Sequence, residues 1–391
     1  MATGDGVTGP TGGQGQPYGG PPQAGSQPWP PQQYGGPPPW GPPPPWGGPQ
    51  PWVPPPYPGA AVPPTDARPP LPRFPHPEPR EYHQMLRTWN YAWWKPVVGI
   101  VLVVVGMLIV APMVLMPILI VGVMFEDGNF WENFESAASL EAVGPASLLY
   151  LNLTLGSAIL ITWFVMRVVH RMRPRWLTSV VPKMRWKLLF IFIGISVVAL
   201  IAQMGVAMLV ELLMPGEQDV SVSGKVNDFT ATTALLALIV LLTTPLQAAG
   251  EEYVFRGYLM QALGSLWRNK WVALLATSLL FAVAHGVQNF PLFFDRFMFG
   301  FIAGWLVIRT GGLEAGIAMH ILNNFFAFGY ALAFADLSES LNVSEVGWEN
   351  IPVTLTQALT YAGLVLLVSR KLDVQRRTAP PADLVRPEPA A

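Results

Sequence analysis

Two adjacent glutamates and a nearby arginine are the first residues in this sequence whose types and spacing could support chemistry. They lie in the stretch Gly250-Glu-Glu-Tyr-Val-Phe-Arg-Gly257, after an apolar run that ends at Ala248. In a helix, Arg256 can pair with Glu252 one turn earlier, whereas Glu251 points about 100° away and is free to act elsewhere. One interpretation is a general base beside a structural ion pair, and the alternative is an interfacial salt bridge that ends an apolar span.

Histidine is the second candidate type, because its imidazole gains and loses protons near neutral pH. Of the five histidines, only His285 and His320 lie in hydrophobic runs, whereas His76, His83 and His170 lie in or beside polar segments. Taken singly, each of the two is equally well explained as a hydrogen-bond bridge between helices.

An asparagine follows His320 at a spacing that places both on one helical face. Asn324 is four residues after His320, while Asn323 points roughly 100° away. A polar clamp between helices would explain this pair alone. A carboxylate, two imidazoles and an amide donor on three separate apolar segments are, however, the groups that hydrolysis requires. The predicted catalytic set is therefore Glu251, His285, His320 and Asn324.

The elements that would position these residues are membrane-spanning helices. Of the 391 residues, 51% are hydrophobic and 12% are charged, about half the charged fraction of an ordinary soluble domain. Apolar runs long enough to cross a hydrocarbon core about 30 Å thick recur from Val97 to Val368. The sequence predicts an all-α, polytopic transmembrane helical bundle of about eight spans, namely 97–125, 143–166, 187–214, 230–248, 271–289, 293–308, 313–335 and 352–369.

The loops between these spans alternate in the sign of their charge. Loop 126–142 is acidic, loop 167–187 carries seven Lys and Arg residues, and loop 336–349 is acidic again. Because cytoplasmic loops carry an excess of Lys and Arg, we expect an integral membrane protein with both termini cytoplasmic, in a bacterial plasma membrane. The short loop at Asp295 and Arg296 has no clear charge bias.

Composition divides the chain into four parts. Residues 1–80 hold 28 of the 42 prolines and 15 of the 37 glycines, which predicts a disordered cytoplasmic tail because no packed core can form. The alternative is a docking segment, with a partner of the Pro-rich tail. Residues 81–186 hold an interfacial segment and two N-terminal transmembrane helices, and 187–335 hold the predicted site. Residues 336–391 hold the last transmembrane helix and a basic, Pro-rich C-terminal tail.

Net charge and cysteine content bear on which partners and which chemistry the chain can have. The net charge is -1, which does not favour nucleic acid as a partner. The chain has no cysteine, which excludes disulfides, thiolate metal sites and a cysteine nucleophile.

Three short motifs occur in a fixed order on successive predicted helices. They are Glu-Glu-x-x-x-Arg at 251–256, Phe-x-x-x-His at 281–285 and His-x-x-x-Asn at 320–324. In this order they resemble the CPBP family, which comprises CAAX prenyl endopeptidases of the Rce1 type, bacteriocin-processing enzymes and Abi proteins. The resemblance covers roughly residues 187–335, and every motif position is present.

The resemblance implies an intramembrane endopeptidase that cuts a peptide bond near the cytoplasmic membrane face. It implies that Glu251, helped by His285, activates the attacking water, and that His320 and Asn324 stabilise the oxyanion. The substrate would be a membrane protein or a lipid-anchored peptide in the lipid bilayer. A prenylated Cys-a-a-X terminus is the archetype for one branch of the family, but this sequence fixes neither the lipid nor the peptide.

The resemblance leaves a metalloprotease mechanism open beside the glutamate mechanism. Zn²⁺ on Glu251, His285 and His320 would keep one position open for water. We favour the glutamate mechanism, because each ligand comes from a separate helix and no His-Glu-x-x-His pairing supports a zinc site. In either mechanism Glu252 and Arg256 would form a structural pair.

Two hypotheses from other classes use the same buried polar residues. In a membrane transporter or channel, Glu251, His285 and His320 would relay protons or bind an ion, but the sequence shows no internal repeat of the kind that many transporters have. In a non-catalytic membrane scaffold, the Pro-rich tail would carry the function.

Straight spans fit the predicted set poorly. If the fifth span starts near Trp271 at the cytoplasmic side, His285 lies about 21 Å deep, whereas Glu251 and His320 lie nearer that side. We therefore expect that the segment 251–266 runs back into the bundle or that the fifth helix begins below the membrane surface, where irregular backbone can line a wet cavity.

Overall fold

The computed structural model describes residues 75–214 and 226–380, in which every regular element is a helix. The described part has no strand, only two isolated bridges, Glu81 with Arg377 and Ser179 with Gly312. The prediction of an all-α transmembrane bundle is confirmed. The predicted tail lies outside the described residues except for 75–80, as does the end of the chain from 381.

Seven helical stretches within the described ranges are long and apolar enough to cross a membrane. They are α1 to α2 (Trp94–Val105 and Ala111–Val123, joined by the π-helical η2, Gly106–Val110), α4 to α5 (Pro145–Gly156 and Ala158–Val168), α6 (Trp186–Leu213), α7 to α8 (Ala231–Glu252 and Met260–Trp267, joined by the π-helical η4, Tyr253–Leu259), α10 (Phe290–Thr310), α11 (Glu314–Phe334) and α13 (Asn350–Lys371). The shorter elements are η1 (Tyr82–Gln84), α3 (Phe130–Ser139), η3 (Pro174–Trp176), α9 (Lys270–Val283) and α12 (Leu337–Leu341).

The helix that carries the two glutamates does not end near residue 248, so the span boundary predicted there was wrong. α7 continues through η4 and α8 to Trp267. The charged sequence does not stop the helix because Glu252 and Arg256 neutralise each other, Nη1 to Oε1 at 2.9 Å. Pairing of this kind offsets part of the cost of burying the two charges.

α9 corresponds to the fifth predicted span, 271–289, and is shorter than predicted. Its 14 residues extend about 21 Å, less than a hydrocarbon core about 30 Å thick. Residues 284–289 continue beyond it without helical structure. The backbone N–H of Asn289 donates to the carbonyl of Ser344 at 2.8 Å, which ties this turn to the loop before α13.

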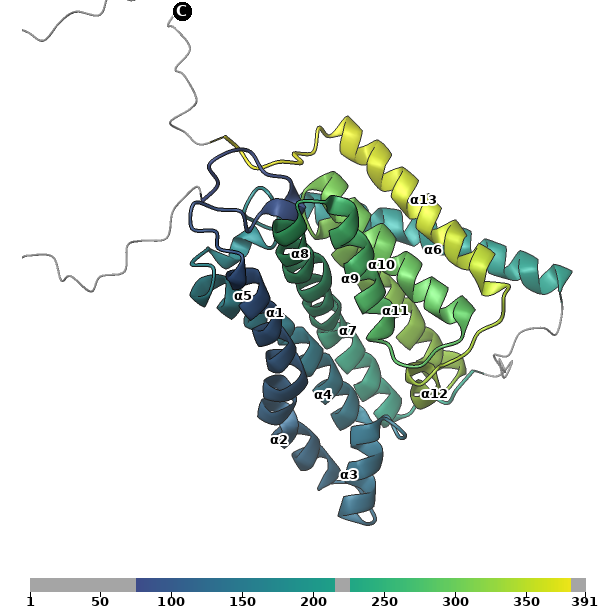
Figure 1. The fold of residues 1–391 in the computed structure, drawn as a ribbon. Helices are drawn as coiled ribbons and strands as arrows, with labels where there is room; N and C mark the ends of the chain where they lie inside the picture. The colour runs from purple at the N-terminus through teal and green to yellow at the C-terminus, as the bar shows by residue number, and fades with distance from the viewer. Residues whose placement is uncertain (1–74, 215–225, 381–391) are drawn as a thin grey trace, which may run out of the picture. The chain divides into compact units, whose positions relative to one another are not determined.

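The glutamate-bearing helix lies in the middle of the helical packing (Figure 1). α7 packs against α4 on one side and α11 on the other, and α11 also contacts α6 and α10. α13 covers α6 and α10, while α9 packs against α8 and α10. This order places α7, η4 and α11 side by side, so polar groups on their facing sides can be shielded from lipid.

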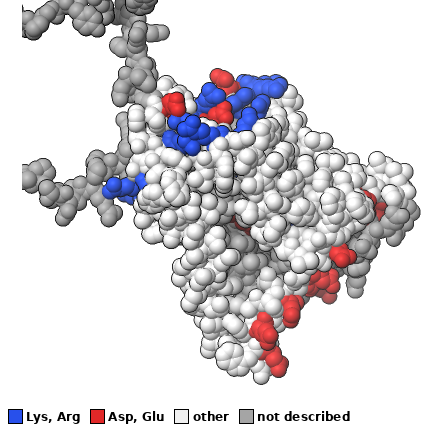
Figure 2. Space-filling model, viewed as in Figure 1, with Lys and Arg blue, Asp and Glu red and all other residues white. Residues whose placement is uncertain are grey.

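Lys and Arg gather at one end of the bundle and most Asp and Glu at the other (Figure 2). The separation agrees with the alternating loop charges in the sequence. The loop predicted at Asp295 and Arg296 was wrong. They lie inside α10, which begins at Phe290, and Thr354 of α13 donates its hydroxyl to Asp295 Oδ1 at 2.6 Å.

Residues 75–93 are packed against the basic end of the bundle, including six residues that composition assigned to the tail. His76 is 3% exposed and donates Nε2–H to the carbonyl of Met85 at 2.7 Å. Its ring meets the edge of Trp176, with 5.0 Å between centroids. Burial lowers the pKa of His76 from 6.5 to about 4, because low-dielectric surroundings disfavour the charged imidazolium.

Candidate active site

Glu251 is the accessible one of the two adjacent glutamates. It lies in the last turn of α7, and its side chain retains 12% exposure. Gln247, one turn earlier, donates Nε2–H to Glu251 Oε1. The other oxygen, Oε2, lies 3.7 Å from His320 Nε2, which is too far for a hydrogen bond. Oε2 is therefore free to accept a proton from a water molecule.

Glu252 is fully buried and serves a different purpose. Its Oε1 accepts from Arg256 Nη1 at 2.9 Å and from His320 Nδ1 at 3.0 Å. Gly316 of α11 lies against the carboxylate, and a Cβ at that position would clash with Oε2. The pair predicted from the helical spacing thus also fixes His320, which links α7 to α11.

The contact with Glu252 determines which hydrogens His320 can offer. Because a carboxylate only accepts, Nδ1 must carry a hydrogen. In the neutral imidazole, Nε2 is then an acceptor that faces Glu251. His320 can donate a hydrogen bond from Nε2 only as the imidazolium, so an oxyanion role for this ring requires its charged form.

His285 lies two residues beyond the end of α9, at the start of the irregular turn. Its Nδ1 donates to the carbonyl of Phe281 at 2.8 Å, which leaves Nε2 free. The next residue, Gly286, has φ +84°, a left-handed conformation that glycine adopts without strain. His285 is exposed, and its ring lies 4.6 Å from that of Phe281 between centroids, while the ring of His320 lies 6.0 Å from the same phenylalanine, so the two imidazoles share one region.

The antiparallel hairpin of α8 and α9 explains how Glu251 and His285 come to the same depth. Glu251 lies 16 residues before the end of α8, and His285 lies 15 residues after the start of α9. Both are therefore about 23 Å from the turn that joins the helices. The expectation that the segment 251–266 runs back into the bundle was wrong, because this segment continues α7 as far as Trp267.

Asn324 joins this group through a residue that the sequence analysis missed. Asn324 Nδ2 donates to Gln247 Oε1 at 2.8 Å, while the Nε2 of the same glutamine donates to Glu251. An amide nitrogen has two hydrogens, so Asn324 keeps one for another acceptor. Gln247 lies four residues before Glu251 and is 6% exposed. Its four-residue spacing from Glu251 and its polarity in an apolar run were the features of the sequence that could have indicated its role.

Aromatic rings close the inner side of the site. Arg256 lies over the ring of Phe281 at 4.0 Å and near that of Phe299 at 5.4 Å. Phe299 meets His320 edge-on at 5.0 Å between centroids. Rings in these positions hold the guanidinium and the imidazole in place and keep water from the Glu252 side.

The residues do not fit the three-ligand zinc set considered from the sequence. Among the described residues, no three His, Cys, Asp or Glu side chains are placed so that they could hold one metal ion. His320 Nδ1 donates to Glu252 and His285 Nδ1 to a backbone carbonyl, which leaves the Nε2 atom of each ring as the one nitrogen that could bind a metal.

The fold and these residues define a class of protein: an integral membrane helical bundle with a carboxylate, an imidazole and an amide between its helices and a second imidazole in the turn after α9. Residues 232–326 match the family model described as type II CAAX prenyl endopeptidase Rce1-like. This segment contains all three motifs, and the match agrees with their resemblance to the CPBP family.

Two curated proteins each resemble part of the chain. "Uncharacterized protein YyaK" of Bacillus subtilis (strain 168) is 32% identical over 111 residues, which are 27% of this chain and 37% of the relative. "Uncharacterized 24.3 kDa protein" of Escherichia coli is 34% identical over 90 residues, 22% of this chain and 40% of the relative. The similarity thus spans less than half of each relative. No solved structure matches the chain significantly.

Proposed function

We propose that this protein is an intramembrane peptidase in which Glu251 activates the attacking water. The main support is the contrast between two neighbouring carboxylates. Glu252 is buried and bonded to Arg256 and His320, whereas Glu251 is partly exposed and keeps Oε2 without a hydrogen bond. A general base needs an accessible oxygen held in a fixed position, and Gln247 holds Glu251 through its other oxygen.

The chemical step uses the groups around Glu251. The carboxylate takes a proton from water while the water oxygen attacks the carbonyl carbon of the scissile bond. The proton then passes to the leaving nitrogen as the C–N bond breaks, giving a carboxylic acid and an amine. His285, whose free Nε2 lies in the same region, assists the proton transfer.

The negative oxygen of the tetrahedral intermediate is stabilised by Asn324 and His320. Asn324 has an unused amide hydrogen, and the imidazolium form of His320 donates from Nε2. Donors that are already oriented in a site with little water stabilise a developing charge strongly. Gln247 is a positioning residue, since it fixes both Glu251 and Asn324.

The substrate class proposed is a membrane protein or lipid-anchored peptide. The family description of residues 232–326 names CAAX prenyl endopeptidases. Glu251 lies about 24 Å along its helix from the α8–α9 turn at the basic end. This depth suits a peptide segment that enters from the membrane, and it is greater than the position near the cytoplasmic face that the sequence led us to expect.

Comparison of peptide termini tests this proposal. Membranes with the wild-type protein, Glu251→Gln or Glu211→Gln would be compared by mass spectrometry of newly formed termini. Glu211 is a matched control, because it is an exposed carboxylate on α6 without an ion pair among the described residues. We expect the new termini to disappear with Glu251→Gln and to remain with Glu211→Gln. The same termini in all three samples would refute peptidase activity at Glu251.

A synthetic peptide carrying one identified cleavage site then distinguishes the two hydrolytic mechanisms. The purified protein in liposomes should cleave it at an unchanged rate after treatment with a tight chelator. Loss of cleavage that added Zn²⁺ restores would replace the glutamate mechanism with a metal mechanism.

We further propose that the basic end of the bundle faces the cytoplasm of a bacterial cell, with both termini on that side. The support is the concentration of Lys and Arg at that end (Figure 2). A reporter fused after Lys371 should read cytoplasmic and one inserted near Leu341 external. A cytoplasmic signal at Leu341 would reject this orientation.

A further inference from the structure

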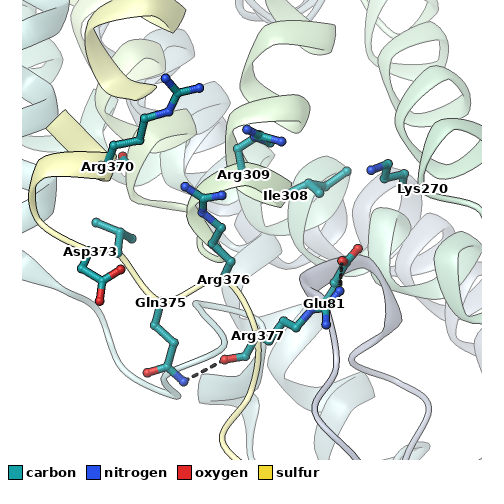
Figure 3. Close-up of a pocket in the computed structure, with 11 residues that line it drawn as sticks. Glu81, Lys270, Ile308, Arg309, Arg370, Asp373, Gln375, Arg376 and Arg377 are labelled. Carbon is teal, nitrogen blue, oxygen red and sulfur yellow. Dashed lines mark hydrogen bonds and ion pairs between the residues drawn. The ribbon is translucent and has the colours of Figure 1, made fainter. Parts of the chain in front are cut away.

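A pocket of about 880 Å³ opens at the basic end of the bundle, and Glu251 is not among the residues that line it. Its walls come from the start of α9, the end of α10, the end of α13 with the segment 372–377 after it, and Glu81. Figure 3 shows the side-chain ends of Arg309, Arg370 and Arg376 around the same open space.

The pocket carries an excess of positive charge. Arg377 is paired with Glu81, Nη2 to Oε1 at 2.8 Å, and this hydrogen bond lowers the pKa of Glu81, which therefore stays charged. Four other lining cations have no ion pair among the described residues, against one unpaired carboxylate, Asp373. These four cations are Lys270, Arg309, Arg370 and Arg376.

The walls are held in place by backbone contacts. After α13, Val374 N–H donates to the carbonyl of Ser369 at 3.0 Å, and Asp373 takes φ 45° to make the turn. Further on, Thr378 N–H donates to the carbonyl of Arg80 at 2.9 Å. The segment that closes the pocket is therefore part of the fold, and the pocket exists before any ligand binds.

Two buried donors at this pocket have no acceptor. Ser369 is 1% exposed, lines the pocket, and its hydroxyl has no partner in the described part of the chain. The Nε of Arg309 is likewise buried without a partner there. An unpaired buried donor costs about 1 to 3 kcal/mol, so such groups indicate a missing acceptor.

Tryptophans place the pocket at the level of lipid headgroups. Trp267 ends α8 and Trp271 lies in the first turn of α9, with exposures of 59% and 48%. Exposed tryptophans at the ends of spanning helices mark the membrane interface. Lys270 lies between them in the sequence and lines the pocket.

We propose that this pocket binds the phosphate of an anionic phospholipid headgroup. Guanidinium groups match phosphate in charge and geometry, and the hydroxyl of Ser369 and Nε of Arg309 supply the donors that lack an acceptor. Basic pockets at the membrane interface suit anionic headgroups. This site is separate from Glu251, so its test does not depend on peptidase activity.

Native mass spectrometry of the purified full chain in detergent tests the proposal, with phosphatidylglycerol, phosphatidylcholine and inorganic phosphate as separate probes. We expect phosphatidylglycerol to bind more tightly than phosphatidylcholine, and the double variant Arg309→Gln, Arg376→Gln to weaken it about ten-fold or more. The control Lys183→Gln, Lys187→Gln removes two exposed positive charges outside the pocket, and should change binding by less than about two-fold.

Ser369→Ala separates a built site from a general attraction to positive charge. It changes no charge, yet it should weaken phosphatidylglycerol binding if the buried hydroxyl contacts the phosphate. Unchanged binding in this variant together with equal losses in both double variants would overturn the proposal. If inorganic phosphate and phosphatidylglycerol bind equally well, the proposal that the phosphate belongs to a lipid headgroup is wrong.

Discussion

Glu251 and Glu252 are neighbours in the sequence with opposite surroundings: one side chain is 12% exposed and the other 0%. Glu251→Gln should keep the fold and lower turnover by about 100 to 10,000-fold, because an amide cannot accept a proton from water. Glu252→Gln should instead lower the free energy of unfolding by about 3 to 5 kcal/mol, since Arg256 loses its charged partner in the interior. Thermal unfolding in detergent and turnover of an identified peptide measure both effects.

The test is which of the two variants loses turnover and which loses stability. If Glu252→Gln is inactive but fully stable, and Glu251→Gln is active, the two glutamates have exchanged roles in our assignment.

Gln247→Leu should lower kcat by about ten-fold or more with little change in KM. Leucine keeps most of the volume but removes the hydrogen bonds that hold Glu251 and Asn324, and misplaced catalytic groups slow the chemical step. Gln357→Leu is a matched control, because Gln357 donates to Asn323 at 2.7 Å in an amide pair between α11 and α13. Equal changes of kcat in both variants would reduce Gln247 to a structural role.

Asn324→Ala should lower turnover by about 100 to 1,000-fold without unfolding the protein, as expected for the loss of one oxyanion donor. The neighbouring asparagine provides the comparison. Asn323→Ala should cost about 1 kcal/mol of stability through its lost bond to Gln357 and leave turnover unchanged. A normal rate for Asn324→Ala, measured on the same peptide, would remove this residue from the catalytic set.

Acidification should destabilise the packing of residues 75–93 against the basic end. Burial lowers the pKa values of His76 and His170 from 6.5 to about 4, so the unfolded chain binds more protons than the folded one between these limits. The contribution of each neutral, buried histidine to the free energy of unfolding is therefore complete above pH 6.5. It is lost as the pH falls toward 4, by at most about 3 kcal/mol per histidine. His76→Gln, followed by thermal unfolding across this pH range, should flatten the dependence. If the stability of the variant depends on pH as steeply as that of the wild type, His76 is not a cause of the pH dependence.

Helical spacing and motif order allowed the main groups of the site to be predicted. The four-residue intervals placed Glu252 with Arg256 and His320 with Asn324 on common faces, and the structure shows the ion pair and the shared region. The domain boundaries at 80, 186 and 335 and the catalytic roles stay predictions.

The sequence alone could not predict which residues contact one another between helices. Hydropathy ended the span at 248 because Glu251, Glu252 and Arg256 count as charged, whereas the contacts of Glu252 with Arg256 and His320 allow the helix to continue. Gln247 was missed because a single amide in an apolar run has no motif, and its importance depends on a partner 77 residues away, Asn324.

The short length of α9 has a mechanical consequence for the surrounding lipid. Its 14 residues fall about 9 Å short of an average hydrocarbon thickness, and the backbone that follows is satisfied locally, with Gln288 Nε2 donating to the carbonyls of Ala282 and Gly286. Hydrophobic mismatch of this kind is relieved when the bilayer thins next to the short helix. The elastic cost of that thinning rises with acyl-chain length, so cleavage should be faster in liposomes of short-chain than of long-chain phosphatidylcholine. Equal rates in both would show that the membrane beside His285 is not deformed, and that α9 fits its bilayer by other means.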